Sequence, residues 1–148
     1  MEDEYQAALA LALKKLHNSD RFESEVRGFL APYPGETVDR VLAFLHEKRL
    51  LDDVRAAESF LRANSGKGSE RLRADLEQKG VPSEIVSSAI PDREQELRTA
   101  VALLRKKSLA PSEVGKGARF LGSRGFSEDV IGSAIQEHFG EQPAQEAI

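Results

Sequence analysis

Residues 71–90 read RLRADLEQKGVPSEIVSSAI, and residues 116–135 read KGARFLGSRGFSEDVIGSAI. The two stretches align without gaps, and both contain a basic residue followed by glycine and end in Ser-Ala-Ile. A weaker copy lies earlier in the chain, where Leu30 takes the place of Leu76 and Leu121. Repetition of this kind is typical of small helical units that stack on one another. The sequence therefore predicts an elongated, curved array of three tandem three-helix repeats.

The composition predicts an all-α fold. Alanine, leucine, glutamate and arginine dominate, and apolar residues recur at three- and four-residue spacings. In the first helix, at 5–16, the expected inward face carries Leu9, Ala12, Leu13 and Leu16. We expect nine helices in three repeats at 1–50, 51–91 and 92–139, the first repeat being degenerate. An acidic and disordered tail is expected at 140–148.

Helix ends are predicted from short polar residues and glycine. A side-chain oxygen at the start of a helix accepts a hydrogen bond from a free backbone N–H, which favours serine and aspartate there. Gly80 is expected to end the fifth helix, because only glycine adopts a left-handed conformation without cost. The predicted N-terminal caps are Asp52 or Asp53, Ser69, Ser83, Ser112 and Ser127.

The overall composition excludes several classes of protein. The chain has 148 residues and no cysteine, so disulfides, thiolate metal sites and cysteine nucleophiles are excluded. No apolar run reaches the roughly 18 residues of a membrane span, and the N-terminus MEDEY is acidic, unlike a signal peptide. We expect a cytoplasmic protein.

Charge is distributed unevenly along the chain. The net charge is −4, yet residues 98–127 hold seven lysines and arginines with Glu113 as the only acid. From Glu128 onward the charged residues are all acidic. Two interpretations of the basic segment stay open: a solvated helix face, or a docking face for a polyanion or an acidic protein.

The stretch SGKGSERLR (residues 65–73) has a glycine-lysine pair, which raises the possibility of a phosphate-binding loop. Such loops place Ser or Thr directly after the lysine and follow a strand. Here Lys67 is followed by Gly68 and a helix precedes, so we interpret the stretch as a joint between helices.

No pattern of catalytic or metal-binding residues stands out. His17, His46 and His138 lie far apart, and Asp52-Asp53 is explained by helix capping. We predict no catalytic residue, no metal site and no cofactor. A third hypothesis is an enzyme with an unrecognised active site between repeats.

The best functional candidates are basic residues at matched places in the second and third repeats. Lys79 aligns with Arg124, and Arg71 aligns with Lys116. If the repeats stack regularly, such residues form a spaced row of cations that suits a polymeric, anionic partner. The predicted partner-binding residues are Lys67, Arg71, Arg73, Lys79, Lys116, Arg119 and Arg124.

These motifs resemble the recombination regulatory protein RecX family. The resemblance covers roughly residues 5–139 and is most specific in the central repeat. It rests on Leu51-Asp52-Asp53, Phe60, Lys67-Gly68, Arg71, Leu76 and Lys79-Gly80, and in the third repeat on Phe120-Leu121, Arg124-Gly125-Phe126-Ser127, Val130-Ile131 and Ala134-Ile135.

The resemblance implies a regulator of RecA, the bacterial strand-exchange recombinase. Family members bind the RecA nucleoprotein filament and hinder its growth, ATPase, strand exchange and co-protease activity. We therefore expect a non-enzymatic monomer that binds this filament, with DNA contact secondary. The alternative is a helical-repeat protein that binds single-stranded DNA independently of RecA.

Overall fold

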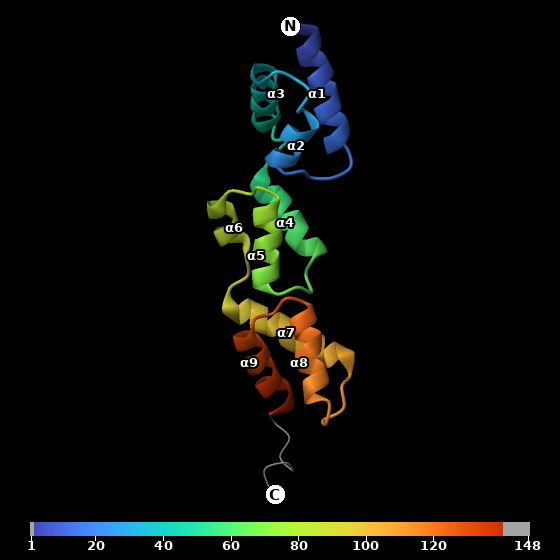
Figure 1. Cartoon of the computed structure of the whole chain (residues 1–148), viewed down its shortest axis with the longest axis vertical. Coiled ribbons are helices and arrows are strands. Elements are labelled where there is room, and N and C mark those ends of the chain that lie inside the picture. The colour runs from blue at the N-terminus through green and yellow to red at the C-terminus, as the bar shows by residue number, and fades with distance from the viewer. Residues whose placement is uncertain (1, 141–148) are drawn as a thin grey trace, which may run out of the picture. The chain divides into compact units, whose positions relative to one another are not determined.

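The structure is a computed structural model that describes residues 2–140, and every regular element in this range is an α-helix (Figure 1). The prediction of an all-α fold is confirmed. The predicted tail at 140–148 lies, apart from Gly140, outside the described residues. The helices are α1 (Glu2–Leu16), α2 (Glu23–Phe29), α3 (Gly35–Glu47), α4 (Asp53–Ala63), α5 (Ser69–Gln78), α6 (Ser83–Ala89), α7 (Arg93–Lys107), α8 (Val114–Ser123) and α9 (Glu128–Phe139).

The chain divides into two compact units. Among the described residues, the first unit comprises 2–63 and 75–89, and the second comprises 64–74 and 90–140. Helix α5 contributes residues 69–74 to the second unit and residues 75–78 to the first. None of the helices in the described range has the length and hydropathy of a membrane-spanning segment.

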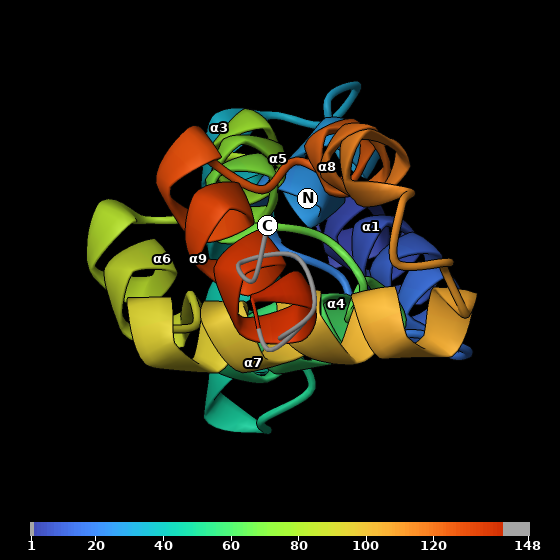
Figure 2. The ribbon, with the colours of Figure 1, turned by 90° about the horizontal axis from the view of Figure 1, so that it is seen from below.

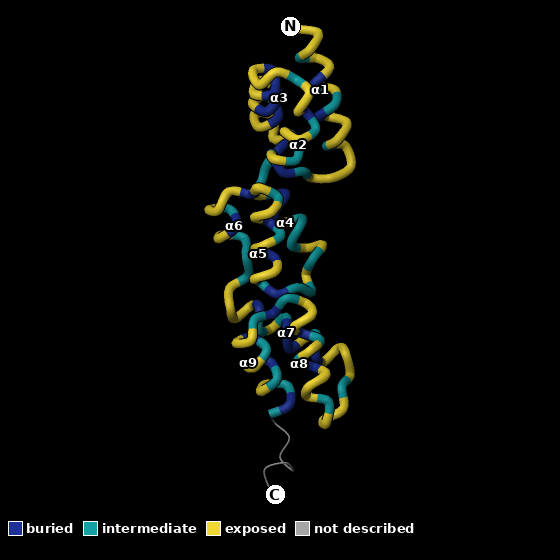
Figure 3. The backbone as a smooth tube through the Cα atoms, in the orientation of Figure 1, coloured by how far each residue is buried: buried dark blue, intermediate teal, exposed yellow. Residues whose placement is uncertain are grey.

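In the first unit, α1 packs against α2 and α3 around an aliphatic core. Figure 3 shows the buried positions of α3 gathered along one side of that helix. On α1 the buried residues are Ala8 and Ala12, whereas Leu13 is 38% exposed, so the predicted inclusion of Leu13 in the inward face is wrong. Alanines four residues apart lie on the same helix face, and their small side chains allow a close approach between helices.

The rest of the first unit is built on the contact between α4 and α6. Ala56 and Ala57 of α4 and Val86 of α6 are buried, as is Leu76 near the end of α5. Gly80 follows α5 with a φ angle of 76°, which confirms the predicted glycine stop. Asp52 accepts hydrogen bonds from the N–H groups of Val54 (2.9 Å) and Arg55 (3.2 Å), so it caps α4.

In the second unit, α9 packs against both α7 and α8. Figure 2 shows the red helix α9 lying beside the yellow and orange helix α7. Fully buried Leu104 and Leu121 anchor the core, together with Phe126 at the turn before α9. The hydroxyl of Ser127 accepts from the N–H of Val130 at 3.3 Å, which confirms the predicted cap of α9.

Three of the predicted caps are wrong. Gly68, not Ser69, precedes α5, because its carbonyl accepts the first helical hydrogen bond from the N–H of Leu72 (3.0 Å). Pro82 plays the same part for α6, so Ser83 is already helical. Helix α8 starts one residue after Glu113, whose carboxylate accepts from the N–H of Ala110 at 2.8 Å and leaves Ser112 in the preceding turn.

Candidate partner-binding surfaces

The seven predicted partner-binding residues fall into both compact units. Lys79 belongs to the first unit, and the other six belong to the second: Lys67, Arg71, Arg73, Lys116, Arg119 and Arg124. Lys67 and Lys79 are half-buried, and the remaining five are exposed. Each unit is therefore described separately.

A close backbone contact in the second unit brings Arg71 and Arg124 together. The N–H of Gly68 donates to the carbonyl oxygen of Arg124 at 2.9 Å. A methyl group on Gly68 would lie only 2.5 Å from the carbonyl carbon of Gly125 and 2.6 Å from Cα of Phe126, so only glycine fits there. The start of α5 is thereby fixed against the turn between α8 and α9.

The side chain of Arg71 also connects α5 to the turn between α8 and α9. Its Nη1 donates to the carbonyl oxygen of Ser123 at 3.1 Å. Gly125 has a φ angle of 89°, and a methyl group there would lie 2.9 Å from Cδ of Arg71. The stem of Arg71 thus packs on the turn while the residue as a whole stays exposed.

The start of α5 is also tied to α7. The hydroxyl of Ser69 donates to the carbonyl oxygen of Pro91 at 3.1 Å, and its N–H donates to the carboxylate of Glu96 at 2.9 Å. Glu96 is only 8% exposed, so this hydrogen bond satisfies a buried carboxylate. The stretch that resembled a phosphate loop is a joint, as predicted from the sequence.

The other predicted cations of the second unit lie outside this joint. Lys116 forms an ion pair with Glu113 at 3.7 Å, one turn earlier. Arg119 lies on α8 three residues after Lys116, with its Nη1 close to Gly115. Arg73 is exposed on α5. The structure therefore brings Arg71 and Arg124 together but leaves Lys116 paired with an acid.

A basic hollow of about 410 Å³ lies beside this joint, within the second unit. Lys107 Nζ lies 4.6 Å, and the Arg124 guanidinium carbon 5.1 Å, from the centre of the Phe120 ring. Sequence reasoning missed Lys106 and Lys107 as site residues; the only signal was their place in the basic segment 98–127. We call this the basic hollow; it is lined by Ser65, Gly66, Leu103, Lys106, Lys107, Phe120 and Arg124.

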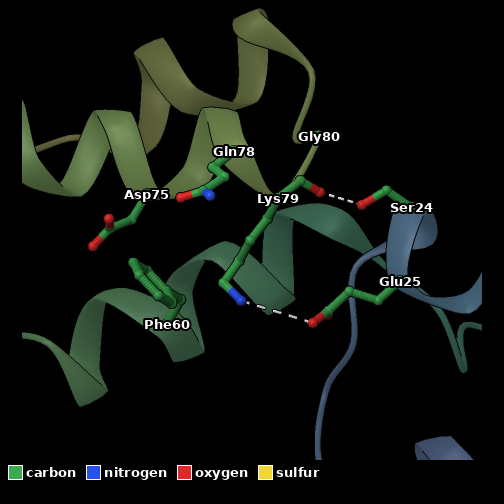
Figure 4. A pocket seen from close by; sticks show the side chains of 7 residues that line it. All are labelled: Ser24, Glu25, Phe60, Asp75, Gln78, Lys79 and Gly80. Carbon is green, nitrogen blue, oxygen red and sulfur yellow. Dashed lines mark hydrogen bonds and ion pairs between the residues drawn. The ribbon is translucent and has the colours of Figure 1, made fainter. Parts of the chain in front are cut away.

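Lys79 lines a different pocket, of about 690 Å³, in the first unit (Figure 4). Its Nζ lies 3.8 Å from Oε2 of Glu25 and 5.9 Å from the centre of the Phe60 ring. The hydroxyl of Ser24 donates to the carbonyl oxygen of Lys79. Figure 4 shows the lysine side chain extending from the end of α5 toward Glu25 on α2. Its charge thus contributes to holding α2 and α5 together.

A second charged cluster in the first unit joins α2, α3 and α4. Oε1 of Glu23 lies 2.7 Å from Nε2 of His46, and this hydrogen bond is the main reason that the pKa of Glu23 is lowered. Oδ1 of Asp53 accepts from the N–H of Glu23 at 2.9 Å, while burial raises the pKa of Asp53. Within residues 2–140, no group of three histidines and acids is arranged to hold a metal ion.

Comparison with known proteins matches residues 52–90 to a family model described as the second three-helix domain of RecX. Regulatory protein RecX of Neisseria meningitidis is 38% identical over 119 residues, which cover 76% of this chain and 78% of that protein. The chain belongs to the RecX family. Regulatory protein RecX of Cronobacter sakazakii is 33% identical over 91% of this chain and 93% of its own. The resemblance found in the sequence is confirmed.

Solved RecX structures share the fold. RecX from Lactobacillus salivarius superposes with a TM-score of 0.78 over 93% of this chain and 98% of that chain, at 22% identity. A second regulatory protein RecX gives a TM-score of 0.68 at 24% identity, over 95% of this chain and 73% of its own. The matched domain at 52–90 contains α4, α5 and α6. The three repeat boundaries drawn from the sequence stay predictions.

Proposed function

We propose that this RecX-family protein regulates the RecA recombinase by binding its nucleoprotein filament, without catalysing a reaction of its own. Binding would inhibit filament growth, ATPase activity, strand exchange and co-protease activity, and would thereby modulate DNA repair and the SOS response. The observation that carries the proposal is the 38% identity over 119 residues to a regulatory protein RecX. The protein would act as a cytoplasmic monomer.

The exposed cations of the second unit support a role in partner binding. Arg71 and Arg124 both lie at the turn between α8 and α9, and the close contact of Gly68 with Gly125 holds this turn in place. The backbone there is already ordered, so it loses little conformational freedom when a partner binds. Arg73 and Arg119 are exposed, and no hydrogen bond or ion pair within residues 2–140 occupies their guanidinium groups. Arg73 and Arg119 are therefore suited to a test by charge reversal.

Co-sedimentation with RecA filaments, assembled on DNA, tests the proposal directly. Wild-type protein should pellet with the filaments and slow RecA ATP hydrolysis. The double variant R73E/R119E should lose most of this inhibition, because reversing two exposed positive charges would turn attraction to an anionic partner into repulsion. The control K14E/K48E reverses the same amount of charge on the first unit and should retain inhibition.

Circular dichroism of both variants shows whether the helices are intact. If R73E/R119E is fully helical and still inhibits like the wild type, these residues do not face the filament. If K14E/K48E loses inhibition equally, net charge matters rather than this surface. If the wild-type protein neither pellets with the filaments nor slows ATP hydrolysis, the proposed function is wrong.

The alternative is binding to single-stranded DNA without RecA. The seven cations against one acid in residues 98–127 favour this alternative as a second candidate. Binding dominated by phosphate contacts weakens steeply as salt rises. A fluorescence titration with an oligonucleotide at several salt concentrations, without RecA, measures this dependence. Clear affinity at physiological salt would favour the alternative.

A further inference from the structure

The basic hollow contains three cations that the chain itself does not neutralise. Lys106, Lys107 and Arg124 all line it, and no acid is among the lining residues. Within residues 2–140, none of the three lies within 4.0 Å of a carboxylate oxygen, whereas Lys116 and Arg93 each pair with an acid. Three like charges that share one small hollow repel one another, so an anion bound there would be stabilised.

Two of these cations are held in position. The Phe120 ring is half-buried and packs on the core of the second unit, and Lys107 and Arg124 both stack over it. The backbone of Arg124 is fixed by the hydrogen bond from Gly68. The missing side chain of Gly66 leaves room for Arg124, since a methyl group there would lie 3.0 Å from its Nη1. A ligand would therefore meet cations that are already ordered.

The same arrangement of two cations over a phenylalanine recurs in the first unit. Phe29 takes the place of Phe120 in the repeat alignment, since each directly precedes the matched leucine. Lys15 Nζ lies 4.8 Å, and the Arg21 guanidinium carbon 5.5 Å, from the Phe29 ring centre. Lys14 and Lys15 lie near the end of α1, as Lys106 and Lys107 lie at the end of α7. The chain thus offers a matched control.

The chemistry of the hollow fits carboxylates better than a nucleic-acid strand. Two cations already cover the Phe120 ring, so it is not free to stack a base, as single-strand binders require. A polynucleotide carries its charges along a line, whereas these three cations converge on a volume of about 410 Å³, the scale of a few side chains. The planar fork of Arg124 matches a carboxylate in bidentate geometry.

We infer that the basic hollow binds an acidic segment of the partner protein, one with at least two neighbouring Asp or Glu carboxylates. The inference rests on the proposed function, because it names the chemistry by which the second unit recognises the partner filament. Lys106, Lys107 and Arg124 would bind the carboxylates, and the absence of a side chain on Gly66 would leave the Arg124 guanidinium its place in the hollow.

The test uses the full chain and a labelled peptide. The probe is a twelve-residue fluorescein peptide with four central Asp and Glu residues, and its control replaces these with Asn and Gln. Anisotropy should show binding of the acidic peptide only. The variant K106Q/K107Q/R124Q should weaken this binding about tenfold, while K14Q/K15Q/R21Q, the matched change around Phe29, should not.

A second variant, G66L, keeps all three charges but places a side chain in the hollow against Nη1 of Arg124, and it should weaken binding as well. The inference is overturned if the triple variant binds the acidic peptide like the wild type, or if the uncharged peptide binds equally well. It is also overturned if the control triple is weakened as strongly. Loss of oligo(dT) binding in the triple variant, without acidic-peptide binding by the wild type, would assign the hollow to nucleic acid instead.

The RecA assay separates the two proposals. If wild-type protein inhibits RecA and K106Q/K107Q/R124Q inhibits it equally, the hollow does not contact the filament and the inference fails, but the proposed function stands. If the wild type has no effect on RecA yet binds the acidic peptide through the hollow, the proposed function fails and the chemistry of the hollow stands.

Discussion

Replacing Gly68 by alanine should strongly destabilise the second unit. The added methyl group would lie 2.5 Å from the carbonyl carbon of Gly125 and 2.6 Å from Cα of Phe126. Both neighbours are backbone atoms, so no side chain can turn aside to make room. The start of α5 must instead move away from the turn between α8 and α9.

The loss in free energy of unfolding is estimated from the overpacking and from the hydrogen bond that this movement would break. Overpacking of a tight site costs roughly 1–3 kcal/mol. Losing the hydrogen bond from Gly68 to the carbonyl oxygen of Arg124, which is 2.9 Å long, adds about 1 kcal/mol. We expect G68A to lower the free energy of unfolding by about 2–4 kcal/mol, which for a chain of this size corresponds to roughly 5–15 °C in Tm.

Thermal and urea unfolding followed by circular dichroism at 222 nm measure the effect. The control is Gly132→Ala, inside α9 of the same unit, where a methyl group would meet nothing within 4 Å. This change should stabilise the protein by about 0.5–1 kcal/mol, because alanine is the better helix former. A G68A variant within about 0.5 kcal/mol of the wild type would refute the steric reasoning.

Three further predictions concern the first unit. G80A should destabilise it by about 1–2 kcal/mol in urea unfolding, because the φ angle of 76° is unfavourable for alanine; an unchanged midpoint would contradict this. Because the hydrogen bond with His46 lowers the pKa of Glu23 from its ordinary value of 4.5, the ionised carboxylate stabilises the fold above pH 4.5, and this is lost as the pH falls through the lower folded value. E23Q should therefore lower Tm at pH 7, with a difference from the wild type that closes in Tm scans below pH 4.5; a constant difference would refute the assignment. A double-mutant cycle with E25Q and K79Q should give a coupling below about 1 kcal/mol, because the pair is 3.8 Å apart and partly exposed; a larger value would mark Lys79 as a stronger structural tie.

Much of the fold could be predicted because its determinants are local. Apolar spacing depends only on neighbouring residues, and so do the cap at Ser127 and the glycine stop at Gly80. The gapless alignment of 71–90 with 116–135 predicts a repeated unit, and its boundaries stay predictions. Because these preferences depend only on residues close in sequence, they can be predicted without knowing the tertiary structure.

The sequence could not show that Ser69 does not cap α5, because distant residues decide it. Its hydroxyl and N–H are taken by Pro91 and Glu96, and Gly68 fits the start of α5 only because the turn at Gly125 lies against it. Short polar residues at helix starts give no sign of such competition from elsewhere in the chain.

The candidate site was predicted only in part, for a similar reason. Repeat alignment selected Arg71 and Arg124, which the structure brings to one turn. Lys106 and Lys107 lie in the last turn of α7, and lysine is common in the last turn of any helix because cations interact favourably with the helix dipole there. Their shared place with Phe120 and Arg124 depends on tertiary packing, which the repeat alignment does not contain.

The contact between Gly68 and Gly125 also limits how this sequence can change over evolutionary time. A clash between two large side chains can be relieved when either one becomes smaller. Here both positions already carry the smallest residue, so a second substitution at one has no way to compensate for a first at the other. The two codons, distant in the gene, are therefore each constrained independently, and this joint should vary less among descendants of the sequence than the larger side chains packed around it.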